Sequence, residues 1–213
     1  MRSSLMKYIY ITSLLLFSST SFATTDRTWT FKVYLGEKDI GSHTFALSTI
    51  NKQTHVKIDA DFDVYFLFIN AYSYDHSNYE VWNGDCLQSI KSSTNDNGEM
   101  QFVNGIQKDR YLNIATHSGP VKAEGCIRSF AYWDPSFLES KALLNAQTGE
   151  ILPIRVELIK EETIPVRNIP TLARHYRLHT DKFTIDLWYS ANNEWLALNS
   201  TTADGSVLRY VIQ

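Results

Sequence analysis

Alternation of apolar and polar residues is the clearest pattern along this chain. In residues 56–66 every even-numbered position is apolar, whereas the odd-numbered positions are aspartate, lysine or tyrosine. Because successive side chains of a strand point to opposite faces of a sheet, this period predicts a half-buried antiparallel strand with its even-numbered side in the core. Residues 29–35 alternate in the same way, and a turn at 36–39 leads into a further strand at 40–50. The chain is therefore expected to begin as a meander.

Turn residues extend this prediction along the chain. Asn83-Gly84 and Asn97-Gly98 each lie between strand-like segments and predict tight hairpin turns, which need positive φ angles. Asn104-Gly105 follows too closely for a third tight turn and predicts a β-bulge. The end of the chain predicts a three-stranded meander over residues 183–189, 195–200 and 207–212.

One segment departs from the β pattern. Asp134 is a favourable helix N-cap, Pro135 suits the first helical position, and apolar residues follow before Gly149. These features predict one short helix over residues 135–145. The expected fold is mainly β: a curved antiparallel meander sheet of about ten strands, forming a half-barrel or an open barrel, with this helix. Alternation does not decide whether such a sheet closes.

The first 23 residues have the features of a secretory signal peptide. Arg2 and Lys7 precede a short apolar stretch, which ends in small residues at Ser21 and Ala23. We expect Sec-type export with cleavage after Ala23, and a single β domain over residues 24–213. The mature chain has no apolar run near ~18 residues, so no transmembrane segment is expected in it. No cysteine follows the apolar stretch to carry a lipid anchor, which predicts soluble release, in a bacterium to the periplasm.

The net charge and the cysteine content restrict the kinds of partner and of chemistry that we expect. The chain has 20 basic and 23 acidic residues, and loss of Arg2 and Lys7 with the signal leaves 18 against 23, a net charge of −5. This argues against nucleic acid as a partner. Cys86 and Cys126 in an oxidising compartment predict a disulfide, and a pair of buried free thiols is the alternative. They do not form a Cys-x-x-Cys pair, so redox catalysis is not expected.

Several long strings of residues resemble one protein family. From Trp29 onward the chain is similar to an uncharacterised proteobacterial family, domain-of-unknown-function family 6134, and this resemblance implies no assigned activity. The closing meander is more loosely similar to the periplasmic half-barrel of bacterial lipoprotein carriers, an analogy of fold alone. The strings that carry the family resemblance include Glu80-Val81-Trp82, Ser129-Phe130-Ala131-Tyr132-Trp133 and Ile185-Asp186-Leu187-Trp188-Tyr189.

Sequence motifs of common catalytic and metal sites are missing. The chain has no Gly-x-Ser-x-Gly, no phosphate-binding glycine loop and no His-Glu-x-x-His. His76 and Glu80, like His175 and His179, are four residues apart, which spans about 13 Å along a strand. Neither pair can therefore hold one metal ion unaided. We expect no cofactor, no metal and no catalytic residue.

The expected strand at residues 72–82 carries aromatic, imidazole and carboxylate side chains on one face. Such a face can line a ligand pocket, or it can be a broad surface face whose tyrosines cover the rim of the core. Tyr132 and Trp133 are ambiguous in the same way, because Trp133 can also pack the helix against the sheet. The candidate ligand-binding residues are Tyr72, Tyr74, His76, Glu80, Trp82, Tyr132, Trp133 and Asn145.

Three functions are compatible with these features. The first is a periplasmic binding module for an apolar or lipid-like ligand, favoured by the 13% aromatic content and the missing catalytic motifs. The second is an envelope enzyme that uses His76 or His43 with Glu80 or Asp134 in acid–base chemistry. The third is an envelope assembly factor that binds another protein.

Overall fold

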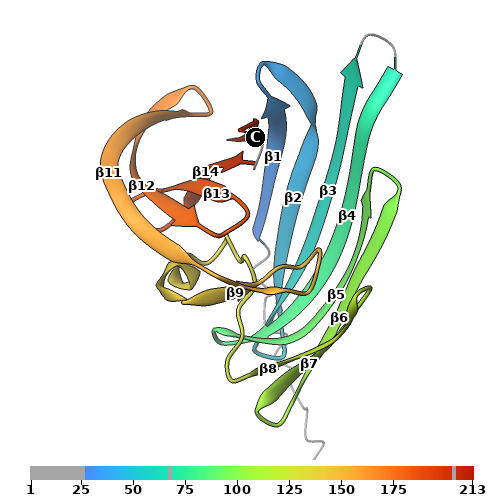
Figure 1. Cartoon of the computed structure of the whole chain (residues 1–213). Coiled ribbons are helices and arrows are strands. Elements are labelled where there is room, and N and C mark those ends of the chain that lie inside the picture. The colour runs from blue at the N-terminus through green and yellow to red at the C-terminus, as the bar shows by residue number, and fades with distance from the viewer. Residues whose placement is uncertain (1–26, 67–68, 203–204) are drawn as a thin grey trace, which may run out of the picture.

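A computed structural model describes residues 27–66, 69–202 and 205–213 and contains one large, strongly curved antiparallel sheet. Its 13 strands follow the order β11-β12-β13-β14-β15-β1-β2-β3-β4-β5-β6-β7-β8, so the last strand of the chain pairs with the first. The edge strands β8 and β11 are not paired with each other, and the sheet is not a closed barrel (Figure 1). The strands are β1 (Arg27–Leu35), β2 (Lys38–Ile50), β3 (Gln53–Phe66), β4 (Ile69–Asn83), β5 (Cys86–Asp96), β6 (Glu99–Lys108), β7 (Tyr111–Thr116), β8 (Gly119–Glu124), β11 (Arg155–Val166), β12 (Ile169–His179), β13 (Thr184–Tyr189), β14 (Trp195–Thr201) and β15 (Val207–Ile212).

The predicted fold class is confirmed, although the number of strands is larger than expected. With β9 (Ala142–Leu144) and β10 (Ile151–Pro153) the described residues form 15 strands instead of about ten. The opening and closing meanders are present, as β1–β2 and β13–β15. No helix among the described residues is long and apolar enough to span a membrane. The predicted signal peptide lies outside the described residues.

The segment of residues 125–154, here called the covering segment, connects β8 to β11 and packs against the core of the sheet. It contains the short 3-10 helix η1 (Pro135–Glu139) and the β9–β10 hairpin. Phe137, Leu143 and Leu144 are buried, so this segment supplies apolar contacts that the sheet needs on its concave side. This loop region therefore fills the concave side of the open sheet.

The prediction of a helix over residues 135–145 is wrong beyond Glu139. Asp134 caps η1 as expected, since its side chain accepts from Ser136 N at 3.0 Å. Ser140 is extended, however, and Ala142–Leu144 pairs with Ile151–Pro153. Pairing as a strand buries Leu143 and Leu144 completely, and this tertiary gain outweighs the local preference for helix.

Strand β3 has the predicted register. Val56, Ile58, Ala60 and Phe62 are buried, whereas the alternate positions between them are exposed or half-buried. The even-numbered side therefore faces the core, as predicted, over the residues whose side chains are described.

One turn prediction is confirmed, one is displaced by a residue, and one bulge prediction is wrong. Asn97 and Gly98 form a turn with φ values of 52° and 96°. The β4–β5 turn is formed by Gly84, with a φ of 54°, and Asp85, because Asn83 still pairs with Cys86 as part of the strands. At Asn104-Gly105, β6 pairs with both neighbours without interruption. A Cβ on Gly105 would lie 2.7 Å from Ile90 Cγ2, so glycine is there because the buried Ile90 packs against its backbone.

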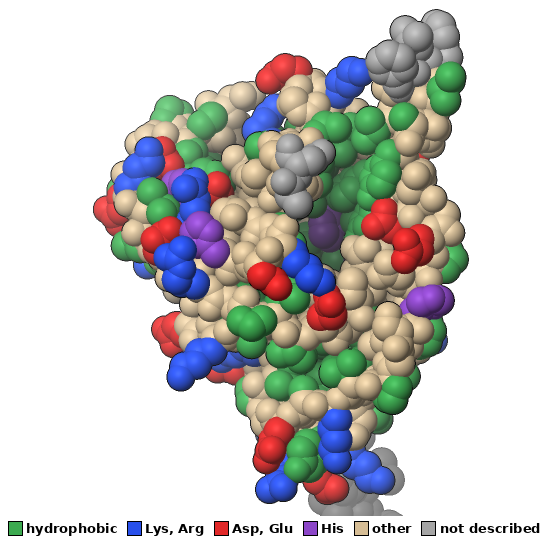
Figure 2. Space-filling view, in the orientation of Figure 1, with side chains coloured by type: hydrophobic (Ala, Val, Ile, Leu, Met, Phe, Trp, Pro, Cys, Tyr) green, Lys and Arg blue, Asp and Glu red, His purple; other side chains and the backbone are tan. Residues whose placement is uncertain are grey.

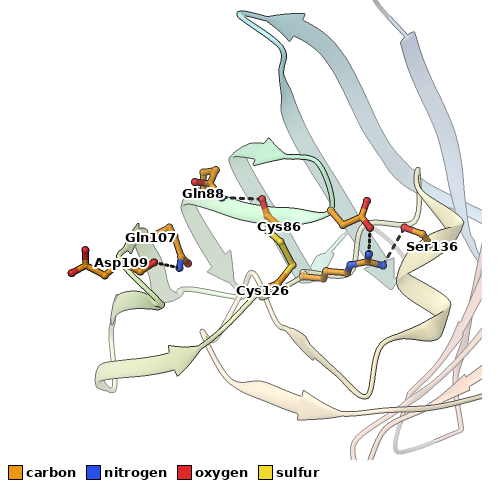
Figure 3. The surroundings of a disulfide bond; sticks show 8 residues. Cys86, Gln88, Gln107, Asp109, Cys126 and Ser136 are labelled. Carbon is orange, nitrogen blue, oxygen red and sulfur yellow. Dashed lines mark hydrogen bonds and ion pairs between the residues drawn. A yellow bond between two sulfur atoms is a disulfide. The ribbon is translucent and has the colours of Figure 1, made fainter.

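The predicted disulfide between Cys86 and Cys126 is present and ties the covering segment to β5 (Figure 3). The two Cα atoms are 4.9 Å apart. Beside the bridge, Leu87 N donates to Ile127 O at 2.9 Å, and Arg128 forms an ion pair with Asp85 at 2.6 Å. The start of the covering segment is therefore fixed at the β4–β5 turn, where β4 ends and β5 begins.

Candidate ligand-binding cavity

The candidate site is built on the concave face of β4. The register of β4 between β3 and β5 places Tyr72, Tyr74, His76, Glu80 and Trp82 on one face, as the alternation predicted. Their burial increases along the strand: Tyr72 and Tyr74 are half-buried, whereas Glu80 is 1% exposed. The covering segment accounts for this gradient, because it packs over the Glu80 end of the strand.

A cavity of about 130 Å³ lies between this face and the covering segment. Five of the eight candidate residues line it, and the other three, Tyr72, Trp82 and Trp133, do not. The lining residues are His43, Phe45, Ile58, Tyr74, His76, Asn78, Glu80, Ser129, Phe130, Tyr132, Asn145, Ala146 and Gln147.

Glu80 is the polar centre of the cavity wall. Its Oε1 accepts from Asn78 Nδ2 at 2.9 Å, and its Oε2 accepts from Trp82 Nε1 at 2.9 Å and Ser129 Oγ at 3.1 Å. Burial raises the pKa of Glu80 because it penalises the carboxylate, and the three donors oppose this shift. The carboxyl group joins β4 to the covering segment.

Two neutral histidines face the same cavity. Burial lowers the pKa of His43 to about 3 and that of His76 to about 4. His43 stacks on Phe45 with ring centroids 4.3 Å apart, and its ring nitrogens are buried with no hydrogen-bond partner among the described residues. His76 Nδ1 lies 2.8 Å from Thr94 Oγ1. Both imidazoles are therefore uncharged at neutral pH.

A turn at residues 145–149 closes one side of the cavity. Gln147 Oε1 accepts from Tyr74 Oη at 3.2 Å, and Gln147 Nε2 donates to Asp96 Oδ2 at 3.1 Å. Tyr72 Oη donates to the other Asp96 oxygen at 2.7 Å. Tyr72 is thus placed at the rim, where it orients Asp96 and, through Asp96, the turn.

Trp82 and Trp133 pack against each other beside the cavity without lining it. Their rings meet edge to face, with centroids 5.5 Å apart and an interplanar angle of 90°. Trp133 borders a different groove of about 910 Å³ between η1 and the β11–β12 hairpin. Trp133 therefore packs beside Trp82, toward the end of β4 that the disulfide ties to the covering segment, and does not line the cavity.

An apolar row continues from the cavity toward the end of the sheet that the covering segment leaves free. The register pairs Leu208 of β15 with Leu35 of β1, and Val64 of β3 with Tyr72 of β4. All four side chains are partly exposed. Figure 2 shows a hollow of the surface lined by hydrophobic side chains, with a histidine visible inside it.

Sequence reasoning missed Asn78, Ser129 and Gln147. Asn78 lies on the predicted face of β4, so the alternation contained its signal. Ser129 and Gln147 belong to loops without periodicity, and only the folded covering segment brings them to Glu80 and Tyr74.

The acid–base candidates are engaged in other contacts. Asp134 caps η1, and its carboxyl group binds Ser136 through both oxygens. The oxygens of Glu80 are occupied by three donors, and no hydrogen bond joins Glu80 to a histidine among the described residues. The described part of the chain also contains no group of three or more His, Cys, Asp or Glu side chains placed to hold a metal ion.

Comparisons with known proteins agree with this fold. The chain belongs to the family described as domain of unknown function DUF6134, which matches residues 31–213. A crystal structure of a β-barrel-like protein of domain of unknown function DUF1849 from Brucella abortus aligns with a TM-score of 0.61 and 9% identity, over 87% of this chain and 94% of that one. No curated protein matches the chain. The structural likeness is one of fold.

Proposed function

We propose that this protein is a periplasmic binding module that holds an apolar or lipid-like ligand on the concave side of its curved sheet. The observation that carries the proposal is the cavity lined by His43, Tyr74 and His76, with the partly exposed apolar row at the neighbouring end of the sheet. Export after residue 23 would bring the protein to lipid-rich surroundings. The disulfide is of the kind that oxidising compartments preserve.

The size of the cavity supports binding of one end of a ligand. A volume of about 130 Å³ is below the roughly 300–1,000 Å³ of pockets that enclose whole drug-sized molecules. A long apolar ligand would insert one end into the cavity and lie with the rest along Leu35, Val64 and Leu208. The apolar area covered in this way would supply most of the binding free energy.

The protonation of the cavity supports an uncharged inserted end. His43 and His76 are neutral at pH 7, and burial raises the pKa of Glu80. An anionic group would meet no positive charge here, because both histidines are neutral, and its burial would cost several kcal/mol. A methyl end, a hydroxyl or an ester carbonyl fits these side chains better.

The proposal is tested by ligand recovery from protein purified from the periplasm, followed by lipid extraction and mass spectrometry. We expect a bound lipid-like molecule, and fluorescence enhancement when the uncharged probe N-phenyl-1-naphthylamine is added to stripped protein. Ala146→Phe places a ring into the cavity wall and should abolish both signals. Ala115→Phe is the matched control, because Ala115 is exposed on β7. Protein that is consistently ligand-free and does not bind the probe would refute the proposal.

A further inference from the structure

A second groove lies on the opposite face of the sheet, under the β11–β12 hairpin. Strand β12 pairs with β13 only from Arg174 to His179, and the rest of the hairpin curls over as a hook toward the C-terminal strand (Figure 1). At the tip, Arg167 Nε donates to Gln213 O at 2.6 Å. Between the tip and β13–β15 this hook encloses a groove of about 520 Å³, here called the hook groove.

The hook groove is separate from the cavity of the proposed function. It shares no lining residue with that cavity, and its lining residue Ala197 alternates along β14 with the core residue Leu198. Adjacent residues of a strand face opposite sides of the sheet, so the groove opens on the side away from the main core.

The lining combines apolar walls with positive charge. Among the described residues that line the groove, Arg167 and Arg209 are the only ones with charged side chains, and Arg167 already donates through Nε to the oxygen of Gln213, which also lines the groove. The volume lies within the range of small-molecule pockets. The apolar walls are formed by Ile164, Pro165, Trp188, Leu196, Ala197 and Val211.

At the floor of the hook groove, Trp188 is held by neighbouring residues, and the charge of the nearby Glu162 is compensated. Trp188 stacks on His175 with ring centroids 4.4 Å apart, and its Nε1 donates to Glu162 Oε1 at 3.0 Å. Glu162, which is close to the groove but does not line it, also forms an ion pair with Lys160 at 3.0 Å. The indole therefore offers a fixed apolar surface, and the nearby carboxylate is already compensated.

Both arginines retain donors for an anion. Apart from its Nε contact, Arg167 has no hydrogen bond to the described residues. Arg209 lies over the ring of Tyr34 at 4.7 Å, and its nearest carboxylate, on the almost fully exposed Glu37, is 4.0 Å away. A planar guanidinium with free N–H groups is well suited to bind a carboxylate or phosphate in two places.

We propose that the hook groove binds a single-chain anionic amphiphile, with the acyl chain against Trp188 and Ala197 and the acidic group at Arg167 and Arg209. The proposal goes beyond the concave site and does not depend on it. The ligand chemistry also differs, because the concave cavity favours an uncharged end whereas the hook groove offers two guanidinium groups.

The test is calorimetric titration of the mature protein with sodium dodecanoate, below its micelle concentration, and with 1-dodecanol. The double variant Arg167→Gln/Arg209→Gln should weaken dodecanoate binding by roughly tenfold or more, because it removes charge-assisted hydrogen bonds, and should change dodecanol binding little. Arg110→Gln/Arg155→Gln removes the same charge from exposed positions outside the groove and should leave dodecanoate binding unchanged. Circular dichroism checks that each variant is folded.

Three results would overturn the hook-groove proposal: dodecanoate does not bind, both arginine pairs weaken it equally, or only Ala146→Phe weakens it. The last result would assign the amphiphile to the concave cavity. Conversely, Ala146→Phe that loses N-phenyl-1-naphthylamine but retains dodecanoate would support two separate sites, so failure of one proposal is distinguishable from failure of the other.

Discussion

Ser129 Oγ donates a hydrogen bond to Glu80 Oε2 at 3.1 Å, and through this contact a carboxyl group buried in β4 holds the covering segment against the sheet. Trp82 Nε1 binds the same oxygen at 2.9 Å. Removal of the acceptor would leave buried donors on both elements without partners, and each such loss costs about 1–3 kcal/mol. The wall of the cavity and the stability of the fold therefore depend on one side chain.

We predict that Glu80→Gln is tolerated and Glu80→Leu is not. The glutamine carbonyl can accept from Ser129 and Trp82, and Asn78 Oδ1, which has no partner among the described residues, can accept from the new amide. The expected cost is under about 1 kcal/mol for glutamine and about 3 kcal/mol or more for leucine. Urea unfolding measures both, and equal costs would contradict the hydrogen-bond network.

The pH dependence of the same pair gives a second prediction. The folded protein has a raised Glu80 pKa, so its contribution to stability is full below the unfolded value near 4.5 and is lost as pH rises toward the folded value. The Glu80→Gln variant has no titrating carboxyl group at this position, so it does not lose this contribution. The unfolding free energy of the variant should thus improve relative to the parent as pH rises from the unfolded value to the folded one, by up to about 1.4 kcal/mol per pH unit. Parallel curves would show that Glu80 is not a shifted acid.

His43→Phe should stabilise the protein, and more so in acid. Phenylalanine keeps the stacking on Phe45 and removes two buried nitrogens without partners. The pKa of His43 falls to about 3, so its stabilising contribution is present above the unfolded value of 6.5 and is lost as pH falls. The advantage of the variant should grow by about 2 kcal/mol from pH 7 to pH 5. His117→Phe, at an exposed turn residue, is the control and should gain no such advantage.

Residue patterns predicted the parts of this structure that depend on neighbours in sequence. The period of two predicted the buried face of β3 and the side chains that share one face of β4, because burial on one face of a sheet selects for alternation. The turn at Asn97-Gly98 was predicted because these residues adopt the positive φ angles that a tight hairpin turn needs. The bridge between Cys86 and Cys126 was predicted because an oxidising compartment was expected.

The remaining features depend on contacts between distant residues. Ala142–Leu144 became a strand because Ile151–Pro153 is available to pair with it, and Gly105 is an ordinary strand residue because Ile90 occupies the space of its side chain. Gln147 reaches Tyr74 across 73 positions of the chain. Propensity and spacing contain no information on such partners, so the closure of the cavity was not predictable.

The disulfide should contribute strongly to stability. Cys86 and Cys126 are 40 positions apart, and closing a loop of this size is worth about 4 kcal/mol in the chain-entropy model. The double variant Cys86→Ala/Cys126→Ala should have a lower melting temperature than the parent. Dithiothreitol should lower the melting temperature of the parent but not that of the double variant. Loss of N-phenyl-1-naphthylamine binding in the folded double variant would indicate that the bridge also positions the cavity.

The register of β3 predicts opposite outcomes for two adjacent positions. Phe62 is 7% exposed and stacks on Tyr74 with ring centroids 5.5 Å apart, whereas Asp61 is exposed on the other face. Phe62→Asp should cost about 4 kcal/mol or more, because it removes an aromatic contact and buries a charge. Asp61→Asn should cost under about 0.5 kcal/mol, as changes at the surface usually do. Urea unfolding of the two variants decides the matter: similar costs would mean that β3 is shifted by one residue, which would move Phe62 to the opposite face from Tyr74 and remove this wall of the proposed site.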